Sequence, residues 1–246
     1  MNRQILRFVS VLSVVMLALA SARLIAQDPR FALLVVGIMA GFVVPGWLAQ
    51  RRMRQLLLSG DVRKILGTWQ ASLRRVTYPE TMAPLLTATA YAAYGFIDAA
   101  RQNIERAARG PAWEAAMEQR LFVDTLLDVY EGERDRAMTR ASELERLPLP
   151  PAGFWMKRKI AKLRRGIAAL ARAFAHASEA EDDRALRSAA RSSPLVHWAM
   201  RYARAIVLVD RGRKNDALAL IADAPAWPEE SAFHAFHSEL ITSAAS

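Results

Sequence analysis

The 246-residue sequence contains no cysteine and only four histidines. Without cysteine, a disulfide framework, a thiol nucleophile and a cysteine-based metal site are excluded. The sequence also lacks a P-loop, a GxSxG motif and an HExxH motif, so the usual signatures of phosphate binding and hydrolysis are missing. His234 and His237 are three residues apart and close to Glu239, but a zinc site needs a third and a fourth ligand at suitable spacing. We therefore interpret them as surface residues, expect no enzyme, and assign no catalytic residue, cofactor or metal.

Long apolar runs are confined to the first 50 residues. The runs at residues 5–22 and 31–49 are separated by a short polar segment that contains Asp28 and Pro29. At 1.5 Å per residue they would extend roughly 27 and 28 Å, close to the hydrocarbon thickness of a bilayer. The sequence therefore predicts a transmembrane hairpin over residues 1–50. Gly37 and Gly41 form a GxxxG pattern that allows close helix packing, although small residues are common in membrane helices in any case.

The first apolar run also fits a cleavable signal peptide. Arg3 and Arg7 form a basic region ahead of it, and Ala20, Ser21 and Ala22 form a small-x-small cleavage site. Either alternative predicts the same topology, because positive charges collect on the cytoplasmic side of a membrane span. The basic residues that directly follow the second run, and that we expect at the membrane surface, are Arg51, Arg52 and Arg54. We expect an integral protein of a bacterial inner membrane whose larger domain is cytoplasmic.

Residues 51–246 show a helical pattern throughout. Apolar residues recur at three- and four-residue steps, alanine is abundant, and runs of alternating β-branched residues are missing. Turn glycines recur: Gly60, Gly95 and Gly132 are 35 and 37 residues apart, and Gly212 has similar surroundings. The residues five positions after them, which would let two helices of a unit approach, are Ile65, Ala100, Ala137 and Ala217. A helix–turn–helix period in the mid-thirties predicts an all-α solenoid.

The segment from residue 90 to 111 resembles a tetratricopeptide (TPR) repeat. It has Tyr91 in a first helix, Gly95 at the turn, small residues in a second helix and a closing proline. Segments 128–148 and 205–225 are similar, whereas 178–194 has Ala180 at the turn position. The large first-helix aromatic and the Leu-Gly pair of the family are mostly missing. The resemblance implies an antiparallel helical stack, residues 51–246, that binds protein partners.

The formal net charge is +10, and it is unevenly distributed. Residues 151–176 contain seven basic and no acidic residues, and in a solenoid this segment would be a first helix that lines the concave face. Candidate partner-binding residues are Tyr91, Tyr94, Arg158, Lys162, Arg165, Arg201 and Arg204. The hypothesis is a groove for an acidic protein segment. Anionic lipid headgroups and a merely solvated face are the alternatives, while nucleic acid lacks a recognised motif. Asp124 and Asp128 are interpreted as part of a solvated acidic face.

These patterns favour a non-catalytic protein that is anchored in the membrane and acts as a protein–protein interaction scaffold or assembly factor. The alternative is a structural subunit of a larger membrane or envelope complex, in which the hairpin makes the main contacts. That alternative rests on analogy at the level of the fold.

Overall fold

The computed structural model describes the backbone of residues 30–245 and the side chains of residues 41 and 43–243. Within residues 30–245 there are eleven α-helices and no strand, which confirms the all-α prediction. The chain divides into two compact units, Met1–Met53 and Arg54–Ser246. We describe each unit by itself.

Helix α2 (Arg30–Leu58) contains the second apolar run, residues 31–49. Within the residues whose side chains are described, no helix is both long enough and apolar enough to cross a bilayer. The first predicted span, residues 5–22, lies outside the described residues. Gly37 of the GxxxG pattern lies on the α2 backbone, but outside the residues whose surroundings are described. Gly41 is exposed, and a Cβ placed on it would meet no atom within 4 Å. No described residue therefore packs against Gly41.

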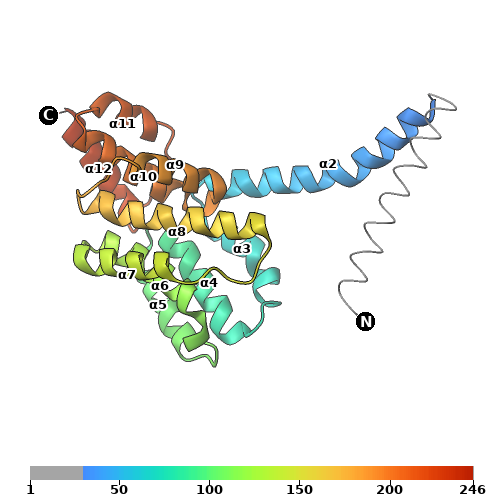
Figure 1. The fold of residues 1–246 in the computed structure, drawn as a ribbon, viewed down its shortest axis with the longest axis horizontal. Helices are drawn as coiled ribbons and strands as arrows, with labels where there is room; N and C mark the ends of the chain where they lie inside the picture. Colours follow the sequence, from blue (N-terminus) through green and yellow to red (C-terminus); the bar gives the residue numbers. More distant parts are fainter. Residues whose placement is uncertain (1–29, 246) are drawn as a thin grey trace. The chain divides into compact units, whose positions relative to one another are not determined.

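The second unit is a series of helical hairpins that follow one another along the chain, from green to red in Figure 1. After α3 (Val62–Leu73) come four pairs: α4 (Pro79–Ala93) with α5 (Ile97–Ala108), α6 (Met117–Tyr130) with α7 (Arg134–Arg146), α8 (Phe154–Phe174) with α9 (Asp182–Ser192), and α10 (His197–Asp210) with α11 (Lys214–Ile221). Short 3₁₀ turns, η1 (Glu114–Ala116) and η2 (Pro194–Val196), precede α6 and α10, and α12 (Ala232–Ala245) ends the series. The first helix of each hairpin packs on the first helix of the next, so the arrangement is solenoid-like.

The four hairpins share one turn geometry. The turn residue has a positive φ of 78° at Gly95 and Gly132 and of 72° at Gly212, a conformation that glycine adopts without steric cost. In each turn the following residue donates its N–H to the carbonyl five positions earlier, as Phe96 does to Tyr91. This is the 6→1 bond of a Schellman motif, which satisfies a carbonyl at the helix end.

The turn between α8 and α9 uses the same geometry without glycine. His176 has a φ of 54°, and the Ala177 N–H bonds to the Arg172 carbonyl. The prediction of Ala180 as the turn residue was therefore wrong by four positions. Histidine tolerates the left-handed region better than β-branched residues do, and here its ring bonds to the Asp210 carboxylate at 2.9 Å. Because the glycine signal is missing, the local pattern did not identify this turn.

Replacing turn glycines by alanine should separate backbone strain from crowding. In Gly132→Ala the new Cβ meets nothing within 4 Å, so only the positive φ acts, and we expect a loss of about 1 kcal/mol in the free energy of unfolding. In Gly95→Ala the Cβ would also lie 2.9 Å from the Ser231 hydroxyl and 3.1 Å from the Ala232 nitrogen, which adds about 1 kcal/mol. Chemical denaturation followed by circular dichroism measures both.

The histidine turn provides the matched control for that comparison. His176→Gly relieves the strained φ and gives up only an exposed hydrogen bond to Asp210, so it should raise the free energy of unfolding by about 0.5 kcal/mol. A loss of stability in His176→Gly, or equal losses in the two alanine variants, would contradict the assignment of these effects to φ and to crowding.

Small residues let the two helices approach closely in three of the hairpins, α4–α5, α6–α7 and α10–α11. The four positions that lie five residues after the turn glycines are all buried: Ile65, Ala100, Ala137 and Ala217. This burial is what the packing interpretation of the sequence predicts. At Ala100, Ala137 and Ala217 the second helix of a hairpin packs directly against its first helix, while Ile65 is the corresponding position on α3.

Helix α12 does more than cover the end of the stack. Its Phe233 and Phe236 rings contact Tyr130 of α6, with ring centroids 5.5 and 5.9 Å apart, and Phe236 lies 5.0 Å from Phe174 of α8. Phe233 also stacks on Tyr202 of α10. Three first helices therefore share one aromatic core with the last helix, and the inner face that a solenoid offers to a partner is filled here by α12.

Candidate functional site

The segment between α11 and α12 returns to the first turns of the unit. Ser231 donates its hydroxyl to the Tyr94 carbonyl at 2.7 Å, and the Ala232 N–H bonds to the Gly95 carbonyl at 2.9 Å. At Gly60 a Cβ would lie 2.9 Å from both Pro225 and the Trp227 ring. Close approach of backbone and ring thus requires glycine at that turn. These contacts fix residues 225–231 against the turns at Gly60 and Gly95.

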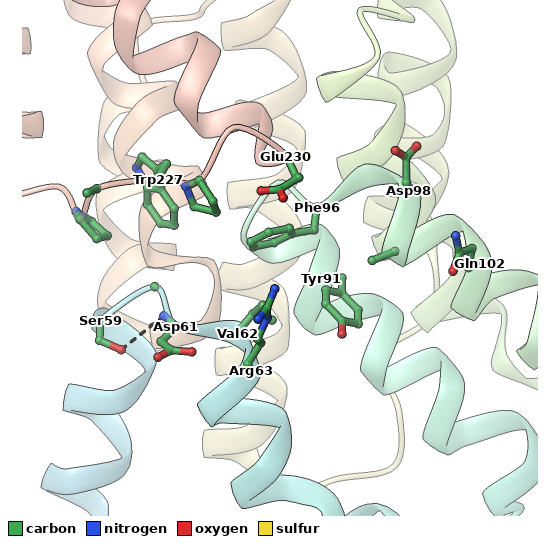
Figure 2. Close-up of a pocket in the computed structure, with 15 residues that line it drawn as sticks. Ser59, Asp61, Val62, Arg63, Tyr91, Phe96, Asp98, Gln102, Trp227 and Glu230 are labelled. Atoms are coloured by element: carbon green, nitrogen blue, oxygen red, sulfur yellow. Dashed lines mark hydrogen bonds between the residues drawn. The ribbon is translucent and has the colours of Figure 1, made fainter.

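A cleft of about 660 Å³ opens where these three segments meet; we call it the turn cleft. Its walls come from residues 59–63, from Tyr91 on α4, from residues 96–102 at the start of α5, and from residues 225–230. Figure 2 shows Trp227 and Glu230 on the returning segment, facing the turn that carries Ser59 and Asp61. The volume is in the range of ligand pockets, which are usually 300–1,000 Å³.

Aromatic side chains form one wall of the turn cleft. The Tyr91 and Phe96 rings meet edge to face, with centroids 6.1 Å apart, and both are only half-buried. Trp227 is buried beneath the cleft, where its indole N–H bonds to the Tyr202 hydroxyl at 2.7 Å. This hydrogen bond and the surrounding rings fix the orientation of the indole at the base of the cleft.

Carboxylates outnumber basic groups around the turn cleft. Asp61, Asp98 and Glu230 line it together with one cation, Arg63. Asp61 caps α3 by accepting the Lys64 N–H at 3.1 Å, and hydrogen bonds from Lys64 lower the pKa of this carboxyl. Asp98 and Glu230 are exposed and form no ion pair with any residue that the structure describes. The arrangement can therefore accept hydrogen bonds from a lysine or arginine that lies across the aromatic wall.

The two predicted tyrosines have different surroundings. Tyr91 lines the turn cleft, as described above. Tyr94 is buried, and its hydroxyl donates to the Leu57 carbonyl at 2.6 Å, so it is oriented into the fold. Burial raises the pKa of Tyr94.

Two of the predicted arginines are paired inside the unit. Arg201 lies over the Trp198 ring and bonds to the Asp223 carboxylate and the Leu220 carbonyl. Arg204 bonds to Asp183 at 2.9 Å. Their positive charges are neutralised by neighbouring elements, and hydrogen bonds from Arg201 in turn lower the pKa of Asp223.

The other three predicted cations lie along one stripe of α8. Arg158 and Arg165 are exposed, and Lys162 is partly exposed. Arg164, which belongs to the same basic segment, turns inward: it is 4% exposed and bonds to Glu118 and to the Leu147 carbonyl. The structure therefore divides this segment into cations that support the fold and cations that face outward.

The interpretation of Asp128 as a solvated residue was wrong. Its side chain is fully buried and lies 2.5 Å from Arg140, 3.6 Å from Arg136 and 3.8 Å from Arg101. Burial raises the pKa of this carboxyl, and the nearby arginines oppose that effect. Arginines on α5 and α7 thus meet one carboxylate of α6, which ties neighbouring hairpins together.

The membrane-surface candidates Arg51, Arg52 and Arg54 are exposed on α2, and Arg51 lies over the Trp47 ring at 5.3 Å. His237 approaches the Tyr202 hydroxyl at 3.0 Å, whereas His234 is exposed.

Sequence reasoning missed four residues of the turn cleft: Phe96, Asp98, Trp227 and Glu230. The turn glycines Gly60 and Gly95 indicate the position of the turn cleft in the sequence. Its remaining wall, residues 225–230, comes from at least 130 residues further along the chain.

Comparisons with protein-family models, with curated proteins and with solved structures return no match to this chain.

Proposed function

We propose that the protein is a membrane-anchored scaffold or assembly factor that binds a segment of a partner protein in the turn cleft, without catalysis. The observation that carries this proposal is the cleft with an aromatic wall and two carboxylates, Asp98 and Glu230, that form no ion pair within the part of the chain that the structure describes. An extended segment with one lysine or arginine beside apolar side chains matches this chemistry. It differs from the acidic segment expected from the sequence.

We further propose that the hairpins are TPR-like repeats and that the anchor, residues 1–50, holds them on the cytoplasmic side of a bacterial inner membrane. The shared turn geometry at Gly95, Gly132 and Gly212 supports the repeat assignment. The basic residues that follow the second apolar run support the topology.

Site-specific photo-crosslinking tests the cleft. With a benzophenone amino acid at Gln102, a cleft residue, we expect one discrete adduct in cells that make the protein, identified by mass spectrometry. Asp98→Lys should reduce its yield about tenfold, because a matched charge becomes a repulsive one at a cost of about 1.4 kcal/mol.

The same photoreactive residue at Glu105 is the control. Glu105 is exposed on the same helix, α5, but does not line the turn cleft. Equal adducts at both positions, or a yield at Gln102 that Asp98→Lys leaves unchanged, would exclude the cleft as the binding site.

The second candidate is a structural subunit that makes its main contacts through residues 1–50. Exposed apolar side chains on α2 favour it: Val43, Val44 and Trp47 are each more than two-fifths exposed. Under this alternative, the photoreactive residue crosslinks to a partner at Val44 and not at Gln102.

A further inference from the structure

Helix α8 begins with three consecutive exposed apolar side chains. Phe154, Trp155 and Met156 are 70%, 77% and 53% exposed. The Phe154 and Trp155 rings meet edge to face, with centroids 5.6 Å apart. The other half of α8 contributes to the core, where Ile167 and Leu170 are fully buried. An aromatic pair left outside the core at one end of a well-packed helix indicates a surface that something else covers.

Three cations follow directly. Lys157, Arg158 and Lys159 are exposed, and none of them forms an ion pair with a residue described in the structure. No acidic residue occupies the first turn of α8. Cations near a helix N-terminus oppose the helix dipole, so this placement is locally unfavourable. Arg164 and Arg172 further along the helix are paired with the carboxylates of Glu118 and Asp182. The cations that pack inside the unit are thus neutralised, whereas the three at the start of the helix are not.

We propose that residues 154–159, the α8 entry patch, insert into the surface of an anionic lipid bilayer. Trp155 and Phe154 would lie at the boundary between headgroups and acyl chains, and the three cations would contact the headgroups. Lys162 and Arg165 continue the basic stripe along the exposed side of the helix. This inference goes beyond the proposed function, because the observations behind it lie neither in the turn cleft nor in residues 1–50.

The shape and charge of the patch favour lipid over protein. Successive helical positions are 100° apart, so the side chains of residues 154–156 project in different directions around the helix. Together they form a protruding tip and not one flat face that could fill a groove. A fluid headgroup layer closes around such a tip without needing a matching pocket. A second copy of the chain is disfavoured, because it would bring the same cations together.

A probe at one position can test the insertion locally. The chain has no cysteine, so Met156→Cys provides a single thiol for the fluorophore NBD. The labelled full-length protein is incorporated into vesicles of phosphatidylcholine, with or without phosphatidylglycerol, that contain spin-labelled lipid. We expect the spin label to quench NBD strongly only when phosphatidylglycerol is present. Because each cation near an anionic surface contributes about a fivefold factor, reversing Lys157, Arg158 and Lys159 to glutamate should lower local partitioning on the order of 100-fold.

Two further variants make the result specific. Arg184→Cys places the same probe at an exposed site of α9, near the opposite end of α8 where Arg172 bonds to Asp182, and it should remain unquenched. Phe154→Ser with Trp155→Ser should reduce quenching at position 156, while the circular dichroism spectrum stays that of the parent.

Three outcomes would overturn the proposal. The first is no quenching at position 156, and the second is equal quenching with phosphatidylcholine alone. The third is a response of the probe to polyglutamate, or to protein concentration without vesicles, that exceeds its response to phosphatidylglycerol. The third outcome would identify an acidic protein segment or a second copy instead.

Discussion

Trp227→Ala should lower the free energy of unfolding by about 3–5 kcal/mol. The indole is 7% exposed and contacts four other rings, with centroids 5.0 Å away at Phe233, 5.9 Å at Trp198, and 6.4 Å at both Tyr94 and Tyr202. Truncation removes these contacts and leaves a cavity that neighbouring helices cannot close. It also frees the segment that forms the lid of the turn cleft. Denaturant unfolding followed by circular dichroism measures the change.

Trp227→Phe is the matched control. It keeps a ring in the core but removes the indole N–H that donates to the Tyr202 hydroxyl at 2.7 Å. The loss should be about 1–2 kcal/mol, from one buried hydrogen bond and a smaller ring. If alanine costs no more than phenylalanine, residues 225–231 are not part of the cooperative core.

Arg164→Ala is the second substitution with a large expected effect, about 2–3 kcal/mol, from the lost hydrogen bonds and the lost packing of its buried stem. The guanidinium joins α6 to the linker before α8: it lies 2.8 Å from Glu118 and bonds to the Leu147 and Pro148 carbonyls at 2.5 and 3.3 Å. Removing it leaves the half-buried Leu147 carbonyl without its donor and breaks the ion pair to Glu118, whose carboxylate is 43% exposed and can be hydrated instead. Denaturant unfolding followed by circular dichroism measures the change in the free energy of unfolding.

The neighbouring arginine is the control for Arg164. Arg165 is exposed and forms no ion pair with a described residue, so Arg165→Ala should change the free energy of unfolding by less than about 0.5 kcal/mol. Arg164→Lys should give an intermediate loss, because a lysine cannot make the forked contact to Glu118 and Leu147 together. Equal effects of Arg164→Ala and Arg165→Ala would show that the buried network contributes nothing.

The sequence predicted those features of the fold that depend on residues close together in the chain. A glycine turn needs a positive φ, and the residue five positions later must be small enough for two helices to approach, so Gly95 with Ala100 and Gly132 with Ala137 identify hairpins locally. Where the turn residue was a histidine, the same reasoning placed the turn four residues too late.

Side-chain roles depended on partners that lie far away in the sequence. Seven basic residues looked alike between residues 151 and 176, but among the pairs that the described residues form, only Arg164 and Arg172 of this segment face carboxylates on other elements. Likewise Arg201 and Arg204 face Asp223 and Asp183, which removes the free charge on which a binding role was predicted. Local spacing cannot report such pairs.

By itself the sequence determined an all-α chain, the hairpin turns and the buried small residues, because helix periodicity and turn conformation are local properties. Only the tertiary structure decided which charges are neutralised, where α12 packs, and that the segment at 225–231 closes a cleft against turns formed more than 130 residues earlier. Those outcomes follow from long-range packing: one ring, such as Trp227, must fill the space that the Gly60 turn and helices α4, α10 and α12 leave between them.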